Sequence, residues 1–240
     1  MSEEVKITKA VILAAGRGTR MKGLTEDIPK PMIEVRGRPI LETIIKGLVE
    51  NGVKEILVVV GYRPEVITDY FAAGENFGCA ISYVTQEIQD GTGRVVDLAI
   101  DFSAGDSFIL SYGDILVAAE SYADLVDFTA VDGKITVKVN EDVSKGGAVF
   151  IDEDGWLTGL IEKPGSGEPT SPYYNAGIYS FSARIFEYTA KLEKSPRGEY
   201  ELTDAIAAMV EDGLKVKAVE LSGDWADVRD PGVVESLNRE

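Results

Sequence analysis

At 240 residues, with 45% apolar residues and a single cysteine, the chain is long enough for one large domain or two small ones and cannot form an internal disulfide. The formal net charge of −17 argues against a general polyanion-binding surface such as nucleic acid requires, and the absence of histidine excludes Ser-His-Asp and Cys-His catalysis. No run of 18 apolar residues suggests a membrane span, and the acidic start at residues 1–4 lacks the apolar region of a secretory signal, so we expect a cytoplasmic protein.

The basic residues are concentrated near the start of the chain. Residues 1–40 hold eight Lys or Arg against five Asp or Glu, whereas residues 41–240 hold 16 against 36. A small cationic segment on an acidic body indicates a local site for an anion, and the acidic excess itself is typical of a solvated surface.

The first half of the chain alternates between strand and helix patterns. Short apolar runs predict buried strands, and apolar residues at helical spacing predict helices between them. The expected strands cover residues 9–15, 55–60, 79–84 and 107–111, and the expected helices cover residues 40–49, 64–73 and 93–102. This β-α-β-α-β order predicts an α/β fold with a doubly wound, mostly parallel sheet.

Beyond about residue 132 the pattern changes to strands joined by Gly-rich turns. We expect strands at residues 134–139, 147–151, 156–161, 174–181 and 215–221, helices near 182–191 and 201–213, and a short last helix after Asp230-Pro231. Because no linker or repeat interrupts the chain, we predict one domain over 1–240, with a mixed sheet.

The strongest local signal is a Gly-rich turn that follows the first predicted strand. It reads Leu-Ala-Ala-Gly-Arg-Gly-Thr-Arg-Met over residues 13–21, and Pro29-Lys30-Pro31 comes shortly after it. Small residues let the backbone approach a ligand closely, and successive N–H groups in such a turn bind anions. With Arg17, Arg20 and Lys30 nearby, the segment suits a triphosphate. It fits neither the dinucleotide-binding Gly-x-Gly-x-x-Gly pattern nor the Gly-Lys-Ser/Thr of a P-loop.

The turn instead resembles the signature of sugar-1-phosphate nucleotidylyltransferases, Leu-Ala-(Ala/Gly)-Gly-x-Gly-Thr-Arg-(Leu/Met) followed by Lys-Pro. The resemblance continues in order along the chain, through Gln86 with Gly91-Thr92, Tyr112-Gly113-Asp114, Glu162-Lys163-Pro164, Asn175-Ala176-Gly177 and Trp225-Ala226-Asp227-Val228. It implies a Rossmann-like nucleotidyltransferase fold (GT-A-like), with a nucleotide-binding half at 1–131 and a sugar-phosphate-binding half at 132–240. Relatives that make acetylated amino sugars often carry a C-terminal β-helix; because the sequence stops just after the predicted transferase unit, we expect no C-terminal β-helix and no fused acetyltransferase.

The resemblance assigns roles to the residues of the turn. The backbone of Leu13, Ala14, Ala15 and Gly16 would bind the base and phosphates of the nucleotide. Arg17 would contact the leaving pyrophosphate, and Lys30 would contact the region of the α-phosphate, because fixed cations stabilise the charge that develops there. Arg20 could equally form a salt bridge within the loop.

A second nucleotide-binding segment is expected around Gln86, Gly91 and Thr92. In similar uridylyl- and thymidylyltransferases such a Gln faces the pyrimidine, and its amide offers the donor and the acceptor that uracil or thymine needs. An exposed polar loop residue is the alternative for Gln86. Arg94 departs from the family's usual small or neutral residue, which leaves base and sugar selectivity open.

The resemblance makes Asp114 and Asp227 ligands of Mg²⁺. Asp114 ends an apolar run, where α/β sheets bind ligands. Mg²⁺ is commonly held by one or two carboxylates together with substrate phosphates, which two distant aspartates would suit. After Asp227 the sequence Val-Arg-Asp-Pro-Gly departs from the family's usual Val-Gly-Thr-Pro-Glu, so this assignment rests on less than that of Asp114.

On the sugar side, the resemblance assigns Glu162 to the sugar hydroxyls, Lys163 to the sugar phosphate, and Asn175 to the sugar. The expected reaction joins UTP or dTTP to a sugar 1-phosphate such as glucose 1-phosphate and releases pyrophosphate. The partners are therefore these small molecules, with no nucleic acid or membrane, and the chain could form a homo-oligomer. Two alternatives stay open, namely a heptose, muramate or mannose 1-phosphate with another base, and a non-catalytic nucleotide or sugar sensor.

Overall fold

The computed structural model describes residues 5–239, so the expectation about a secretory signal at residues 1–4 lies outside the described part. The chain forms two compact units built from interleaved segments. Unit 1 comprises residues 1–6, 90–108 and 127–222, and unit 2 comprises residues 7–89, 109–126 and 223–240. The segments thus do not divide at residue 131, and the assignment of one nucleotidyltransferase domain to 1–240 stays a prediction.

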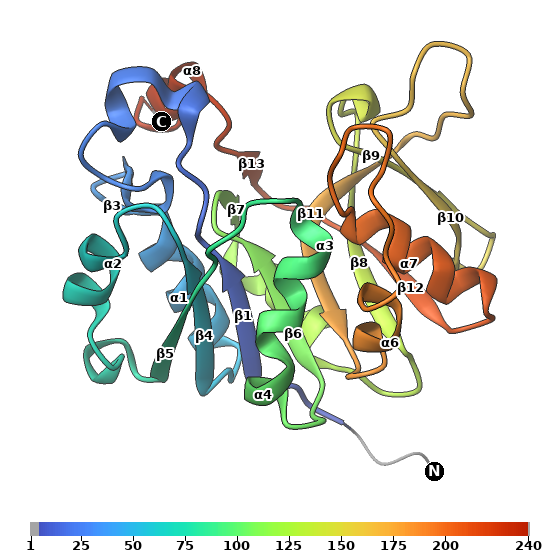
Figure 1. Ribbon diagram of the computed structural model, residues 1–240, viewed down its shortest axis with the longest axis horizontal. Coiled ribbons are helices and arrows are strands. Elements are labelled where there is room, and N and C mark those ends of the chain that lie inside the picture. The colour runs from blue at the N-terminus through green and yellow to red at the C-terminus, as the bar shows by residue number, and fades with distance from the viewer. Residues whose placement is uncertain (1–4, 240) are drawn as a thin grey trace. The chain divides into compact units, whose positions relative to one another are not determined.

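Unit 2 contains the parallel part of the sheet. Figure 1 shows its strands side by side in the order β6, β1, β4 and β5, and β4 pairs in parallel with both β1 and β5. The strands are β1 (Lys9–Leu13), β4 (Glu55–Val60), β5 (Ala80–Thr85) and β6 (Phe108–Tyr112). The central residues of β1, β4 and β6 are almost completely buried, as the continuous apolar runs predict for a parallel sheet, whereas β5, the last strand of the order, has an exposed Ser82 in its middle.

The helices of unit 2 begin and end at the signals that the sequence carries. They are α1 (Ile40–Glu50), α2 (Pro64–Phe71), α5 (Ala123–Val126) and α8 (Pro231–Leu237), with 3-10 turns at Thr19–Thr25, Lys30–Met32, Glu75–Phe77 and Ala119–Tyr122. The Asp230 carboxylate caps α8 by accepting hydrogen bonds from the N–H groups of Gly232 and Val233, and Pro231 occupies its first turn.

Two short antiparallel pairs complete unit 2. β2 (Glu34–Val35) pairs with β3 (Arg38–Pro39), and β7 (Ile115–Val117) pairs with β13 (Trp225–Asp227). The sequence did not predict either pair, because two- or three-residue strands are too short to show alternation.

Unit 1 contains the predominantly antiparallel strands. β11 pairs with β8 and β9, β9 pairs with β10, and all three pairs are antiparallel, whereas β12 joins β8 in parallel. The strands are β8 (Gly133–Val139), β9 (Gly147–Ile151), β10 (Leu157–Glu162), β11 (Tyr173–Phe181) and β12 (Val216–Glu220). The helices are α3 (Thr92–Val95), α4 (Ile100–Ser103), α6 (Ile185–Thr189) and α7 (Leu202–Glu211), with 3-10 turns at Val96–Ala99 and Val143–Lys145.

The structure confirms an α/β fold with a mixed sheet and corrects two predicted helices. The helix expected at 93–102 is divided by the 3-10 turn at Val96–Ala99, which begins at the second of two adjacent β-branched valines, residues that disfavour a regular helix. The helix expected at 182–191 begins only at Ile185, because Ser182 donates its N–H to Asp132 outside the helix. Among residues 5–239 no helix combines the length and the apolar composition that a membrane crossing requires.

Candidate active site

The Gly-rich turn begins at the carboxyl end of β1, in the middle of the parallel strands of unit 2. The N–H of Ala14 donates to the carbonyl of Val59 on β4, and the carbonyl of Leu13 accepts a hydrogen bond from Gly113, just after β6. The turn is therefore attached to both neighbouring strands at the edge of the sheet where α/β proteins bind ligands.

Two glycines allow other segments to approach this turn. A Cβ at Gly113 would lie 2.8 Å from the carbonyl oxygen of Leu13, and a Cβ at Gly61 would lie 2.7 Å from that of Ala15. No side chain fits at such distances. By contrast, a Cβ at Gly16 would meet nothing within 4 Å, so the space in front of Gly16 is open to a ligand.

Lys30 and Asp114 form a close ion pair near the turn. The Lys30 Nζ lies 2.5 Å from Asp114 Oδ2, and Lys30 is only 8% exposed. Lys30 begins the 3-10 turn Lys30–Met32, between Pro29 and Pro31, so its backbone is held by the two neighbouring rings. An ammonium group is thus fixed beside a carboxylate at the carboxyl end of the sheet.

The β7–β13 pair brings Asp227 to Asp114, although 112 residues separate them in the sequence. Asp227 lies opposite Ile115, the residue after Asp114, and the N–H of Val228 donates to the carbonyl of Asp114 at 3.0 Å. The pKa of Asp227 is raised, first by burial and then by the negative charge of Asp114, while Lys30 opposes this shift. Two carboxylates therefore face a common region of unit 2.

The two arginines of the turn differ in their surroundings. Arg17 is exposed, and its guanidinium carbon lies 5.1 Å from the centre of the Tyr62 ring, a cation–π contact. Arg20 is also exposed, but its charge lowers the pKa of Asp227. Among the described residues, Arg20 forms no salt bridge within its loop. The interaction that bears on its role is therefore its effect on the pKa of Asp227.

The structure draws attention to Gln89, which the sequence reasoning missed. The amide of Gln86 donates to the carbonyl of Ile88 in its own loop at 3.0 Å. Gln89 instead donates its Nε2 to the carbonyl of Ala15 at 2.9 Å and so connects this loop to the Gly-rich turn. No sequence pattern distinguishes these two glutamines, which lie in one loop.

Gly91 and Thr92 belong to unit 1, where the segment Ser195–Leu202 holds them. The N–H of Tyr200 donates to Asp90, and the carbonyl of Tyr200 accepts from Gly93, both at 2.8 Å. Gly91 has a φ of +124°, and a Cβ there would lie 2.3 Å from the Tyr200 carbonyl oxygen. Only glycine fits, so the requirement for Gly91 is explained within unit 1 by packing.

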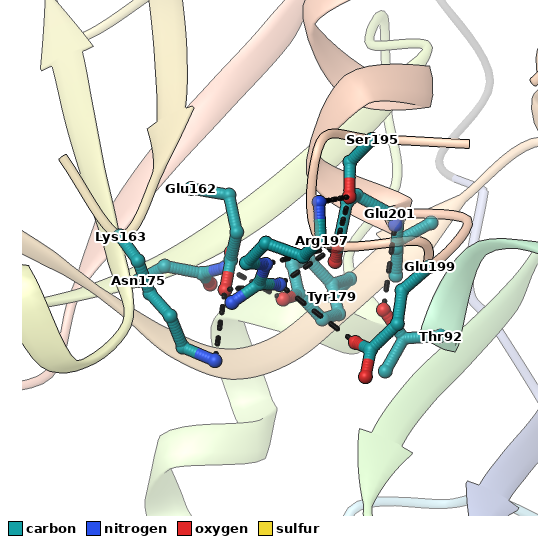
Figure 2. Close-up of polar contacts among 10 residues, drawn as sticks. Thr92, Glu162, Lys163, Asn175, Tyr179, Ser195, Arg197, Glu199 and Glu201 are labelled. Atoms are coloured by element: carbon teal, nitrogen blue, oxygen red, sulfur yellow. Dashed lines mark hydrogen bonds and ion pairs between the residues drawn. The ribbon is translucent and has the colours of Figure 1, made fainter. Parts of the chain in front are cut away.

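Glu162, Lys163 and Asn175 come together at the ends of β10 and β11 (Figure 2). The Lys163 Nζ lies 3.9 Å from Glu162 Oε1, and Asn175 donates its Nδ2 to the Tyr179 hydroxyl at 2.8 Å. Lys163 has a φ of +45°, a strained value for a lysine, and its N–H donates to Gly146. Burial raises the pKa of Glu162, although Lys163 and Arg197 oppose the shift.

Arg197 and Glu201 extend this group and were not anticipated. Arg197 Nη2 lies 2.7 Å from Glu201 Oε1 and 3.5 Å from Glu162 Oε1. Nothing in the sequence Ser-Pro-Arg-Gly-Glu-Tyr-Glu distinguished these residues from an exposed charged loop.

Among the described residues, no group of three or more His, Cys, Asp or Glu could hold a metal ion by itself.

The candidate residues fall into two sets, one in each unit. Unit 2 holds the Gly-rich turn with Arg17, Lys30, Gln86, Asp114 and Asp227, and unit 1 holds Gly91, Thr92, Glu162, Lys163 and Asn175.

Comparison with known proteins identifies relatives over nearly the whole chain. A bifunctional protein GlmU from Methanococcus maripaludis is 38% identical over 229 residues, covering 95% of this chain and 53% of the relative. The chain therefore spans about half the length of the GlmU relatives that it matches. The UTP–glucose-1-phosphate uridylyltransferase AglF from Haloferax volcanii is 35% identical over 228 residues, covering 93% of this chain and 92% of AglF.

A solved structure of UDP-glucose pyrophosphorylase complexed with UDP-glucose has the same fold, with a TM-score of 0.85 over 97% of each chain and 21% identity. The model of the nucleotidyl transferase family matches residues 9–239. The chain belongs to the nucleotidyl transferase family, the class of enzymes that its ordered motifs predict.

Proposed function

We propose that this protein transfers a nucleotidyl group from UTP or dTTP to a sugar 1-phosphate such as glucose 1-phosphate, giving a nucleotide sugar and pyrophosphate. The observation that carries the proposal is the meeting of Asp114 and Asp227 beside Lys30, next to the Gly-rich turn in unit 2. The relative AglF, named as a UTP–glucose-1-phosphate uridylyltransferase and matched over 92% of its length, supports the choice of substrates. Because these substrates are cytoplasmic metabolites, the proposal includes a cytoplasmic location.

The residues present fit a magnesium ion. Asp114 and Asp227 are two partly buried carboxylates whose charges disfavour one another, and Lys30 pairs directly with only one of them. A hard divalent cation that takes carboxylate and phosphate oxygens would relieve this repulsion. Asp114 and Asp227 would hold Mg²⁺, which would neutralise charge on the nucleotide phosphates.

In the proposed reaction, a phosphate oxygen of the sugar 1-phosphate attacks the α-phosphorus of the nucleotide. The new oxygen–phosphorus bond forms as the bond to the bridging oxygen breaks, and pyrophosphate leaves with that electron pair. The attacking oxygen is already an anion, so no residue needs to remove a proton, in agreement with a chain that contains no histidine. Alignment of the two substrates can supply roughly 7–11 kcal/mol of the barrier reduction.

In this proposal, the cations of unit 2 stabilise the charge on the phosphates. Lys30 would contact the α-phosphate region, and Arg17, which lies over Tyr62 and is exposed, would turn towards the leaving pyrophosphate. The backbone of residues 13–16 would bind the nucleotide in the open space before Gly16, and Gln86 of the same unit would contact the base. Gly91 and Thr92 of unit 1 stay predicted nucleotide-binding residues. Glu162 and Asn175 would bind the sugar, and Lys163 its phosphate.

The test is an assay of pyrophosphate release with ATP, GTP, CTP, UTP and dTTP against a panel of sugar 1-phosphates. We expect the highest kcat/KM with UTP or dTTP and glucose 1-phosphate. A preference for another base with a heptose, muramate or mannose 1-phosphate would favour the alternative substrates. Binding of nucleotide without pyrophosphate release from any pair would contradict the proposal and favour a sensor.

A further inference from the structure

Three acidic side chains surround one guanidinium in unit 1. Figure 2 shows Arg197 between Glu162 and Glu201, and Glu199, the most exposed of the three carboxylates, also lies near it. Arg197 Nη2 lies 2.7 Å from Glu201 Oε1, 3.5 Å from Glu162 Oε1 and 3.8 Å from Glu199 Oε2. The motifs and the expected site residues account for Glu162 alone, so the other members need a separate explanation.

Glu201 is the buried member of this group. Its side chain is 6% exposed, and its Oε1 accepts hydrogen bonds from Arg197 Nη2, from Arg197 Nε at 3.2 Å and from the Ser195 hydroxyl at 3.0 Å. Hydrogen bonds between a guanidinium and a carboxylate are charge-assisted and therefore stronger than neutral ones. Glu201 also immediately precedes α7, which packs against β10, so its backbone is part of the rigid unit.

The loop that carries Arg197 is itself fixed. The N–H of Ser195 donates to Glu199 and the N–H of Gly198 donates to Ser195, both at 2.8 Å, which closes the loop on itself. The hydrogen bonds of Tyr200 to Asp90 and Gly93 attach its other end. The guanidinium therefore has few alternative positions while Glu201 holds it.

Neighbouring charged groups influence both the pKa and the orientation of the Glu162 carboxylate. Its side chain is 20% exposed, and the charged groups that face it are Lys163 from the end of its own strand, Arg197 from the loop and Glu201 from the start of α7. Lys163 lies at 3.9 Å and is 46% exposed, so solvent weakens its contribution. Lys163 lowers the pKa of Glu162 more than Arg197 does, but Arg197 is closer and is held by hydrogen bonds to Glu201.

We propose that Glu201 is a positioning residue, which holds the Arg197 guanidinium against Glu162 and so fixes the Glu162 carboxylate for the hydroxyl groups of the sugar. The inference rests on the proposed function only for the sugar. The arrangement of the three side chains is a property of the folded chain without substrate.

The direct test compares the pKa of Glu162 in the wild-type protein and in Glu201→Gln. The carboxyl signals of ¹³C-labelled glutamates are followed by NMR in the full chain, and Glu162→Gln identifies the signal. If Glu201 were only a nearby negative charge, its removal would lower the pKa of Glu162. If Glu201 holds Arg197 in place, the pKa rises, because the cation is released. A fall overturns the proposal.

Arg197→Gln is the second variant, and its folding is checked first by thermal unfolding, because it leaves the buried Glu201 carboxylate without its guanidinium partner. It should raise the pKa of Glu162 as Glu201→Gln does. Adding Glu201→Gln to Arg197→Gln should then lower that pKa, because only the charge effect remains. A further rise in the double variant would contradict the coupling. Glu199→Gln removes the same charge from the exposed side of the loop and should not raise the pKa.

Kinetics then separate the inference from the proposed function. In Glu201→Gln the KM for the sugar 1-phosphate should rise on the order of tenfold, with the KM for the nucleotide unchanged. The loss of kcat/KM should begin at a higher pH than in the wild type as the pH falls. A raised pKa of Glu162 with an unchanged sugar KM overturns the assignment to the sugar. A wild-type protein without turnover refutes the proposed function, while the NMR titration still decides the role of Glu201.

Discussion

At the scale of single residues, the proposed chemistry depends most on Asp114. It pairs with Lys30 at 2.5 Å and lies beside Asp227, so it connects the cation of the site with the second carboxylate. Asp114→Asn keeps the size of the side chain but removes its charge. We expect a loss of at least about a hundredfold in kcat, typical of removing one preorganised electrostatic group. The measurement is pyrophosphate release in saturating Mg²⁺.

Asp27→Asn is the matched control, because Asp27 is an acid of the same unit whose side chain is 91% exposed and pairs only with Arg63 among the contacts described. It should retain wild-type turnover. If Asp114→Asn did the same, the assignment of Asp114 to the metal would be wrong.

Asp227 should oppose the stability of the fold when it is ionised. Burial and Asp114 raise its pKa in the folded protein above the value in the unfolded chain, so the folded state favours the protonated form. The stabilisation contributed by the protonated Asp227 carboxyl is complete below the ordinary aspartate pKa, and it is lost as the pH rises through the raised pKa of the folded protein. Asp227→Asn should therefore increase the Tm at pH 7.

The measurement is thermal unfolding of both proteins without added metal, between pH 4 and pH 8. The difference in Tm should shrink as the pH falls towards 4, because the wild-type carboxyl becomes protonated. A variant less stable than the wild type at pH 7 would show that Asp227 is held by favourable contacts instead.

At the scale of elements, two glycines at the Gly-rich turn are needed for different reasons, Gly113 for close packing of the backbone and Gly16 for ligand binding. A Cβ at Gly113 would meet the backbone of Leu13 and Ala14 at 2.8 and 3.2 Å, whereas a Cβ at Gly16 would meet nothing within 4 Å. Gly113→Ala should thus destabilise the fold by about 1–3 kcal/mol, as overpacking does. Gly16→Ala should leave the Tm unchanged and raise the KM for the nucleotide, because a methyl group would occupy the space proposed for it.

Urea unfolding and nucleotide kinetics of both variants provide the check. An equal loss of stability in the two variants would mean that the space before Gly16 is filled in solution. A normal nucleotide KM in a stable Gly16→Ala protein would remove the turn from the binding site.

The elements also show how much the sequence could predict. The buried parallel strands and α1 were predictable, because continuous apolar runs and helical spacing report burial directly. The pair β7–β13 was not, since three-residue strands carry no periodic signal, yet this pair brings Asp227 to Asp114. The approach of these aspartates could be expected only from the resemblance of the motifs to a family. The surroundings of Arg197 and Glu201 could not be expected from the sequence at all.

At the scale of the whole molecule, the chain has a net charge of −17, yet the proposed site must accept polyphosphates. Unit 2 contributes Lys30 and Arg20, whose charges act on Asp227, and Arg17 on the same turn as Arg20, and a divalent cation would add to this positive charge. We therefore expect Mg²⁺ and nucleotide to bind the folded protein together, each more weakly without the other, because the two carboxylates repel phosphate until a cation neutralises them.

Thermal unfolding measures this coupling without any turnover. A ligand at one hundred times its Kd stabilises the folded state by about 2.7 kcal/mol, which is about 5–11 °C for a chain of this size. UTP with Mg²⁺ should produce a shift of this order in the wild type, and UTP with EDTA a much smaller one. Asp114→Asn and Asp227→Asn should lose most of the dependence on Mg²⁺, whereas Asp27→Asn should keep it. An equal shift with and without Mg²⁺ in the wild type would mean that Asp114 and Asp227 do not hold the metal for the nucleotide, and that Lys30 and the arginines bind the phosphates without it.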